Sequence, residues 1–197
     1  MRLPNARGIA VQMTFSAIAL FLGIVSWTAA SDEKKISPPA VGEEARDFEL
    51  AGIDGNKVKL SSVIEEGPVV LIVLRGYPGY QCPLCTGQVG QFLGRADRLQ
   101  AAGASVIFIY PGPADRLAEH AAEFVGDRKL PKSFRLLIDP DYSFTKAYAL
   151  RWNALRETAY PATFVIDKNR KVLFAKVSKS HGDRASVEDA IRALRAE

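Results

Sequence analysis

The apolar segment Val69–Leu74 is the feature that most constrains how this chain can fold. It is a continuous run rich in valine and isoleucine, which fits a strand buried on both faces of its sheet. Pro78 and Gly79 end the run. From Cys85 the apolar residues recur at three- and four-residue spacing, which predicts an amphipathic helix that ends at Gly103. A buried strand followed by a turn and a helix is typical of α/β proteins.

The rest of the chain supports the same class. The short alternating runs 47–50 and 57–60 flank a turn at Asp54-Gly55-Asn56, which predicts an N-terminal β-hairpin. The other predicted strands are 105–110, 134–138, 162–166 and 172–177. The predicted helices are the one from Cys85 to Gly103, those over 114–125 and 142–149 (the latter capped by Asp139-Pro140-Asp141) and a last helix capped by Ser186. We therefore expect an α/β fold with a central mixed sheet and helices on both faces.

The first 30 residues have the composition of a targeting segment. Arg2 and Arg7 supply a positive start, Ile9–Trp27 carries no charge, and Thr28-Ala29-Ala30 offers the small residues that a signal peptidase reads. We expect a cleaved signal peptide. An uncleaved membrane anchor is the alternative, because 19 uncharged residues nearly span a bilayer. Either reading places the domain outside the cytoplasm, in the periplasm or an equivalent compartment, with a membrane tether in the second.

Residues 31–40 are interpreted as a linker and residues 41–197 as one domain, since 197 residues do not comfortably hold two. Hydrophobic residues make up 48% and charged residues 24%, which is enough for a globular core. The net charge of +4 falls to +2 without Arg2 and Arg7, and the basic residues are dispersed. This charge pattern argues against a nucleic-acid partner.

The only two cysteines, Cys82 and Cys85, lie between the buried strand and the predicted helix. Unpaired N–H groups and the dipole at a helix N-terminus stabilise a thiolate, and a second cysteine three positions on can resolve a mixed disulfide. A domain stapled by disulfides would use more cysteines at wider spacing. The alternatives are a zinc half-site, for which only His120 and His181 could add imidazole ligands, and two inert core cysteines.

The remaining side chains carry weaker signals. His120 and His181 are expected to be solvated surface residues, and Trp152 and Tyr148 to pack in the core or beside the cysteines. No glycine-rich phosphate loop with its lysine is present, and we expect neither a cofactor nor a metal.

From Val41 to about Leu194 the chain resembles the thioredoxin-fold redoxins, specifically the AhpC/TSA peroxiredoxin group and its thioredoxin-like neighbours. The matching segments, besides the cysteine pair, are 45–50, 54–55, 69–74, 75–78, 137–140 and 163–167. The resemblance implies a thioredoxin-like fold and an antioxidant, thiol-dependent oxidoreductase. It also implies a peroxide or protein-disulfide substrate and a thiol reductant protein as partner.

The peroxiredoxin pattern is only partly matched. Pro78 fits the family's proline and Cys85 fits its peroxidatic cysteine, whereas Cys82 stands where those proteins carry Thr or Ser. Their active-site arginine falls at Pro161 here. Arg75 could replace it as a cation near the thiolates, or could simply form a surface salt bridge.

The thioredoxin pattern is also partly matched. In that fold a cis-proline packs against the dithiol, at the place that Tyr160, Pro161 and Thr163 occupy here. We therefore expect these three residues to support the site and the Tyr160–Pro161 bond to be cis. The tryptophan before the first cysteine and the buried acid of thioredoxins are both absent.

Two enzymatic mechanisms fit these residues. In the first, Cys85 attacks a peroxide and Cys82 resolves the sulfenic acid to a disulfide. In the second, Cys82 attacks a protein disulfide and Cys85 resolves the mixed species. The overall resemblance favours the first. Two alternatives of other kinds are a copper-handling module, which would add His120 or His181 to the cysteines, and a permanently closed structural disulfide.

Overall fold

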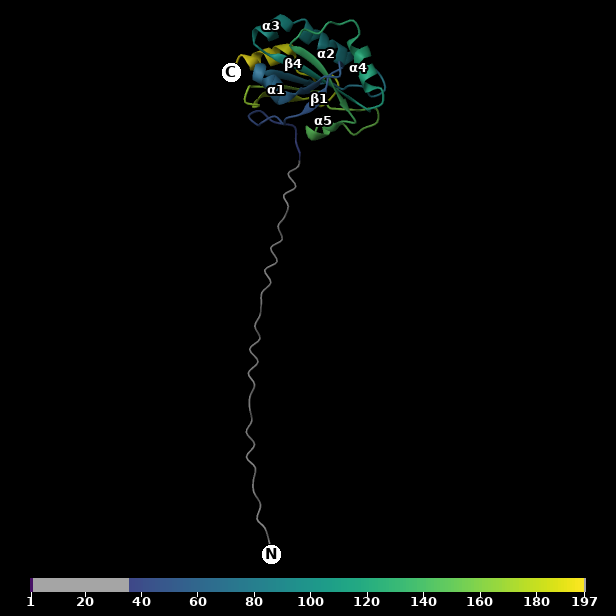
Figure 1. The fold of residues 1–197 in the computed structure, drawn as a ribbon, viewed down its shortest axis with the longest axis vertical. Helices are drawn as coiled ribbons and strands as arrows, with labels where there is room; N and C mark the ends of the chain where they lie inside the picture. The colour runs from purple at the N-terminus through teal and green to yellow at the C-terminus, as the bar shows by residue number, and fades with distance from the viewer. Residues whose placement is uncertain (2–35, 197) are drawn as a thin grey trace. The chain divides into compact units, whose positions relative to one another are not determined.

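The computed structural model describes Met1 and residues 36–196, so the predicted leader and half of the predicted linker lie outside it. Residues from 36 onward form a five-stranded mixed sheet in the order β5-β4-β3-β6-β7 (Figure 1). The strands are β3 (Val69–Val73), β4 (Ser105–Gly112), β5 (Phe134–Pro140), β6 (Ala162–Ile166) and β7 (Val172–Val177). β3 is central, parallel to β4 and antiparallel to β6.

The predicted hairpin is confirmed as a separate two-stranded sheet. β1 (Glu49–Ala51) pairs antiparallel with β2 (Lys57–Lys59), and Leu50 lies opposite Val58. An isolated bridge from Gly52 to Leu137 connects the hairpin to the outer edge of β5.

Helices cover both faces of the sheet, as predicted. One face packs against α2 (Pro83–Leu93), α3 (Ala96–Ala101), α4 (Leu117–Val125) and α6 (Val187–Leu194), and the other against α1 (Leu60–Glu66) and α5 (Ser143–Ala147) (Figure 1). Along β3, Val70 and Ile72 belong to the first core, while Val69, Leu71 and Val73 belong to the second. No helix in the described residues is long and apolar enough to cross a bilayer.

The helices differ from prediction at several places. Helix α4 begins at Leu117 and not at residue 114, and α5 is shorter than the predicted 142–149. The single helix expected from Cys85 to Gly103 is broken into α2 and α3, because Arg95 leaves helical geometry (φ −128°, ψ 18°) directly after Gly94. Glycine favours such a break because it loses more backbone entropy in a helix than other residues. Helix α1 was not predicted. Its apolar residues Leu60, Val63 and Ile64 have helical spacing, but the alternation of the preceding strand ran into Leu60.

Both predicted helix caps are confirmed. The buried Asp139 carboxylate accepts hydrogen bonds from the backbone N–H groups of Phe144 and Thr145 at 2.8 and 3.0 Å. At α6, Ser186 and Asp189 form a reciprocal capping box.

The prediction of a cis peptide at Tyr160–Pro161 is wrong, since no described peptide bond is cis. The trans isomer is intrinsically favoured by about 0.5–1 kcal/mol. In this structure the hydrogen bonds on both sides of the Tyr160–Pro161 bond are made with the peptide in its trans form. The Tyr160 N–H donates to the Leu150 carbonyl, and the Pro161 carbonyl accepts from the Ser178 N–H, both at 2.8 Å. These bonds hold the chain in its direction into β6.

Candidate active site

The chain leaves β3 through a turn that only glycine fits. Gly76 has φ +72°, and a Cβ there would lie 1.9 Å from the Pro111 carbonyl oxygen on β4. The Tyr77 N–H donates to the same oxygen at 2.9 Å. This close approach ties the loop to β4 and directs it toward the start of α2.

Cys82 is the N-cap residue of α2 and Cys85 lies in its first turn, with Pro83 at the first helical position. The N–H groups of Cys85 and Thr86 both donate to the Cys82 carbonyl at 3.1 Å. Neither cysteine is in a disulfide. Cys82 keeps 4% of its surface exposed and Cys85 none, so only Cys82 presents an edge to solvent.

The two thiols have opposite electrostatic environments. A hydrogen bond from the Cys85 thiol lowers the pKa of Cys82 to about 5, helped by the backbone N–H groups of Cys85 and Leu84 and by the charge of Arg184. That same hydrogen bond, together with burial, raises the pKa of Cys85 well above its ordinary value. Both shifts favour the thiolate form at Cys82 and the thiol form at Cys85.

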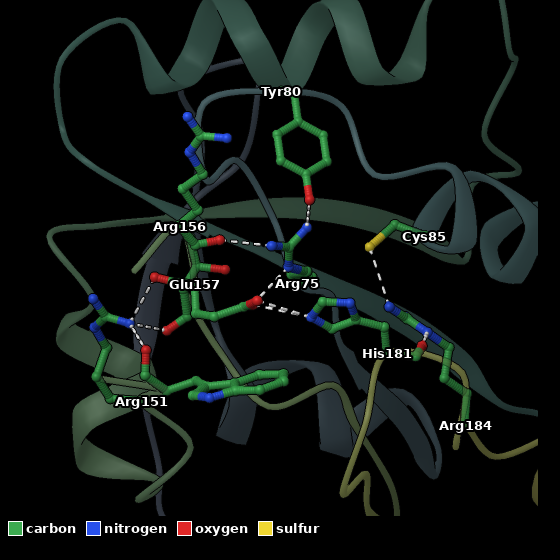
Figure 2. A network of polar contacts seen from close by, with 10 residues as sticks. Arg75, Tyr80, Cys85, Arg151, Arg156, Glu157, His181 and Arg184 are labelled. Carbon is green, nitrogen blue, oxygen red and sulfur yellow. Dashed lines mark hydrogen bonds and ion pairs between the residues drawn. The ribbon is translucent and has the colours of Figure 1, made fainter. Parts of the chain in front are cut away.

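Arg184, in the segment between β7 and α6, places a guanidinium against this pair. Its Nη2 lies 3.5 Å from Cys85 Sγ. Its Nε donates to the His181 carbonyl at 2.7 Å (Figure 2). Its Nη1 donates to Gln88 Oε1 at 2.6 Å. Beside it, a groove of about 350 Å³ runs between the first turns of α2 and residues 182–186.

Arg75 forms a buried ion pair in place of the expected surface salt bridge. Its side chain is 3% exposed and its Nε pairs with Glu157 Oε2 at 2.7 Å. The other guanidinium nitrogens donate to the Arg156 carbonyl and to the Tyr80 hydroxyl (Figure 2). The contribution of Arg75 to the dithiol comes from its backbone, which hydrogen-bonds to Cys85 and favours the thiolate form.

Glu157 joins Arg75 to His181. Its two carboxylate oxygens lie 3.0 and 3.1 Å from His181 Nε2, and its side chain is only 12% exposed. Trp152 lies beside this pair, with its ring 5.0 Å from the His181 ring and stacked on Tyr160 at 4.6 Å. Tyr160 therefore packs on Trp152, which in turn lies beside the Glu157–His181 pair.

The other expected site residues lie in the surrounding frame. Pro78 is half-buried in the loop before α2, and Pro161 is buried just ahead of β6. Thr163 is buried within β6, in register with Ile72 of β3.

Two residues that sequence reasoning missed fix the loop before Cys82. The Tyr110 hydroxyl donates to Gln81 Oε1 at 2.7 Å, and Gln81 Nε2 donates to the His120 carbonyl at 2.9 Å. Neither pairing has a sequence signal, because both join segments that are far apart in the chain.

Neither histidine is simply solvated, contrary to expectation. The ring of His120 stacks on Tyr77 at 3.7 Å and its Nδ1 lies 3.1 Å from Glu123, while His181 binds Glu157. Tyr148 packs in the core under α5, and its hydroxyl donates to the Arg46 carbonyl. Within the part of the chain that the structure describes, no three His, Cys, Asp or Glu side chains gather as a metal site would require.

Comparison with known proteins identifies the family. The sequence model of the AhpC/TSA family matches residues 41–175. This chain belongs to the AhpC/TSA family. It is therefore a thiol oxidoreductase of the peroxiredoxin type, with the thioredoxin-like fold that was predicted. The family match ends before Arg184.

Individual relatives agree with this assignment. A chloroplastic peroxiredoxin Q of rice (Oryza sativa subsp. japonica) is 33% identical over 133 residues, which are 68% of this chain and 57% of the rice protein. Peroxidoxin BcpB from Mycobacterium tuberculosis has a crystal structure with a TM-score of 0.64 and 29% identity, over 80% of this chain and 97% of that one. A "putative Thiol:disulfide interchange protein DsbE" from Chlorobium tepidum reaches a TM-score of 0.59 at 25% identity, over 79% and 99%.

Proposed function

We propose that this protein reduces peroxides through a dithiol–disulfide cycle of Cys82 and Cys85, and that a thiol reductant protein restores the dithiol. The observation that carries the proposal is the pair at the start of α2, in which Cys82 is the N-cap residue with a small exposed edge and Cys85 is fully buried in the first turn, 3.5 Å from the Arg184 guanidinium. The peroxide substrate rests on the AhpC/TSA family and on relatives named as peroxiredoxins.

The chemistry closes within the pair. The Cys82 thiolate attacks the hydroxyl oxygen of the peroxide and becomes a sulfenic acid, while the O–O bond breaks and the other oxygen leaves as an alkoxide or hydroxide that takes one proton from solvent to become an alcohol or water. The Cys85 sulfur then displaces the sulfenic hydroxyl, which leaves as water with the Cys85 proton, and a Cys82–Cys85 disulfide forms. An external dithiol returns the two electrons by thiol–disulfide exchange.

This assignment differs from the family pattern, in which Cys85 occupies the peroxidatic position. Burial is the reason for the difference. Cys85 is fully enclosed and holds its proton, whereas Cys82 has an exposed edge and a lowered pKa. We therefore assign attack to Cys82 and resolution to Cys85.

Protein disulfide exchange led by Cys82 is a second candidate function. It uses the same thiolate on a protein disulfide in place of a peroxide. The likeness to a protein named as a thiol:disulfide interchange protein supports it.

We also propose that the domain works outside the cytoplasm. The support is the composition of the leader, with Arg2 and Arg7 ahead of an uncharged apolar run and a small-residue Thr28-Ala29-Ala30 segment. The reductant would then be a thiol protein of that compartment.

The test is to mix the reduced protein with hydrogen peroxide and to follow thiol loss in the wild type, Cys82→Ser and Cys85→Ser. We expect the wild type to lose both thiols per peroxide far faster than a free thiol reacts. Cys82→Ser should react no faster than a free thiol. Cys85→Ser should react once and stop at a sulfenic acid, which dimedone traps and mass spectrometry locates on Cys82.

Two results would change the conclusion. If only Cys85→Ser abolishes the fast reaction, the nucleophile is Cys85. If all three proteins react no faster than a free thiol, peroxide reduction is overturned. Rapid reduction of a protein disulfide such as that of insulin, lost in Cys82→Ser, would then establish the second candidate function.

A further inference from the structure

The charge that faces the dithiol comes from a part of the chain outside the family match. Arg184 follows β7, whereas the match ends at residue 175 and the position of the family's arginine holds Pro161. The residues around Arg184 therefore show how this chain places a cation at its dithiol.

We propose that Glu157 and His181 are positioning residues, which hold the segment after β7 so that Arg184 stays against the dithiol. The proposal rests on the proposed function, because it takes Cys82 and Cys85 as the redox centre. It adds residues that act on the thiols only through Arg184.

The first step of the argument is the attachment of Arg184 itself. One guanidinium edge meets α2, where Nη2 lies 3.5 Å from Cys85 Sγ and Nη1 donates to Gln88 Oε1 at 2.6 Å. Its Nε donates to the carbonyl of His181, three residues earlier in the same segment, at 2.7 Å. The position of the guanidinium thus depends on where the backbone of His181 lies.

The second step is the anchor of His181. Its ring binds both oxygens of Glu157, a carboxylate that is 12% exposed and comes from the loop before β6. Arg75 at the end of β3 holds that carboxylate from the other side at 2.7 Å. A chain of contacts therefore runs from the central strand through Glu157 and His181 to Arg184 (Figure 2).

The third step is the sign of the effect. A carboxylate near a thiol disfavours the thiolate, and removing this one would also leave the Arg75 cation without its partner. Through space alone, Glu157→Gln would therefore lower the pKa of Cys82. If Glu157 acts by positioning Arg184, the same change withdraws a cation from the dithiol and raises that pKa. The two roles predict opposite shifts.

The experiment measures the thiolate pKa of the reduced protein from its absorbance at 240 nm between pH 3 and 10. We expect Arg184→Met to raise the pKa by about one unit, because the charge of Arg184 favours the Cys82 thiolate and a nearby opposite charge shifts a group by about 1–3 units. Arg184→Lys keeps the charge and should recover part of the shift. Glu157→Gln should raise the pKa in the same direction as Arg184→Met. Glu188→Gln, which removes a surface carboxylate that also joins two arginines, is the matched control and should leave the pKa unchanged.

A double variant shows whether Glu157 acts through Arg184. In the Arg184→Met background, Glu157→Gln should no longer raise the pKa. Circular dichroism checks that each variant is folded. If Glu157→Gln does not fold, His181→Ala breaks the same link while Arg75 stays paired, and it should raise the pKa only when Arg184 is present.

The outcomes separate the two proposals. The positioning role is overturned if Glu157→Gln lowers the pKa or leaves it unchanged, or if Arg184→Met does not raise it. It is also overturned if the shift persists without Arg184. The titration uses no peroxide. A wild type with a depressed pKa that reacts slowly with hydrogen peroxide would therefore overturn peroxide reduction and leave the positioning of Arg184 standing.

Discussion

Cys82 and Cys85 are chemically identical side chains one helical turn apart. Cys82 is the N-cap residue at the start of α2, where the backbone N–H groups of Leu84 and Cys85 favour its thiolate. Cys85 lies inside the first turn and in the core, where burial penalises its charged form. At the scale of single residues, position along one turn of α2 separates the pKa values of the two thiols in opposite directions.

Alkylation by iodoacetamide tests this asymmetry, because only the thiolate reacts. The pKa of Cys82 is lowered to about 5, so its alkylation rate should be flat from about pH 6.5 to 8 and fall roughly tenfold per pH unit below 5. Cys85→Ala removes the thiol donor and should move the midpoint upward, toward the ordinary thiol value of about 8.5.

Cys85→Ser is the control, since its hydroxyl can still donate and should keep the midpoint lower than Cys85→Ala does. Equal midpoints in the two variants would show that the thiol donor has no part in stabilising the Cys82 thiolate.

At the scale of elements, α2 is placed by the turn that precedes it. Arg75 ends the central strand, and Gly76 then passes so close to β4 that no side chain fits. Across the sheet, the Glu157 loop reaches Arg75 and the segment after β7 reaches α2. The site is thus assembled at one end of the sheet by connections between elements.

Two glycine substitutions measure how much this turn contributes to the free energy of unfolding. Gly76→Ala puts a methyl group into the Pro111 carbonyl at a positive φ, and we expect it to lower the free energy of unfolding by at least about 2 kcal/mol. Gly90→Ala lies on the exposed side of α2 with nothing within 4 Å, and should raise it by about 0.5–1 kcal/mol.

Urea unfolding of both variants, compared with the wild type, checks these values. A Gly76→Ala protein as stable as Gly90→Ala would mean that the loop can move away from β4 without cost.

At the scale of the whole molecule, the chain beyond the family match completes both the core and the site. Helix α6 buries Val187, Ile191 and Leu194 against the sheet, and the segment before it carries Arg184. Folding of this segment onto the domain therefore also brings Arg184 to the dithiol. Global stability and redox state should accordingly be linked.

The pH dependence of stability reveals this link. Folding lowers the pKa of Cys82, so the resulting stabilisation is fully present above the unfolded thiol pKa of about 8.5 and is lost as pH falls through about 5. The disulfide form has no such thiol. The free energy of unfolding of the reduced protein, minus that of the oxidised protein, should therefore rise between pH 5 and 8 by up to about 1.4 kcal/mol per unit.

Urea unfolding of both redox forms at pH 5, 6.5 and 8 measures this difference. Cys82→Ser, compared with the oxidised wild type, should show no such rise. A difference that stays constant with pH would contradict a stabilised thiolate in the folded state.

Local patterns determined much of this protein. The apolar run of β3 indicated a strand buried on both faces, and the cysteines were placed correctly at the start of a helix. Asp139 and Ser186 cap helices as predicted. These features depend on neighbours within a few residues, through side-chain periodicity and capping, and a single sequence displays them directly.

Only the tertiary structure decided the rest. Arg184 meets Cys85 across 99 residues of sequence, and Arg75 meets Glu157 across 82. The trans bond before Pro161 is held by hydrogen bonds from both flanking residues to other segments. Each of these contacts depends on which distant segments the sheet brings together. Neither composition nor spacing along the chain predicts which segments those are. The sequence therefore identified the candidate cysteine pair, while the tertiary structure decided the burial of each thiol and placed Arg184 beside Cys85.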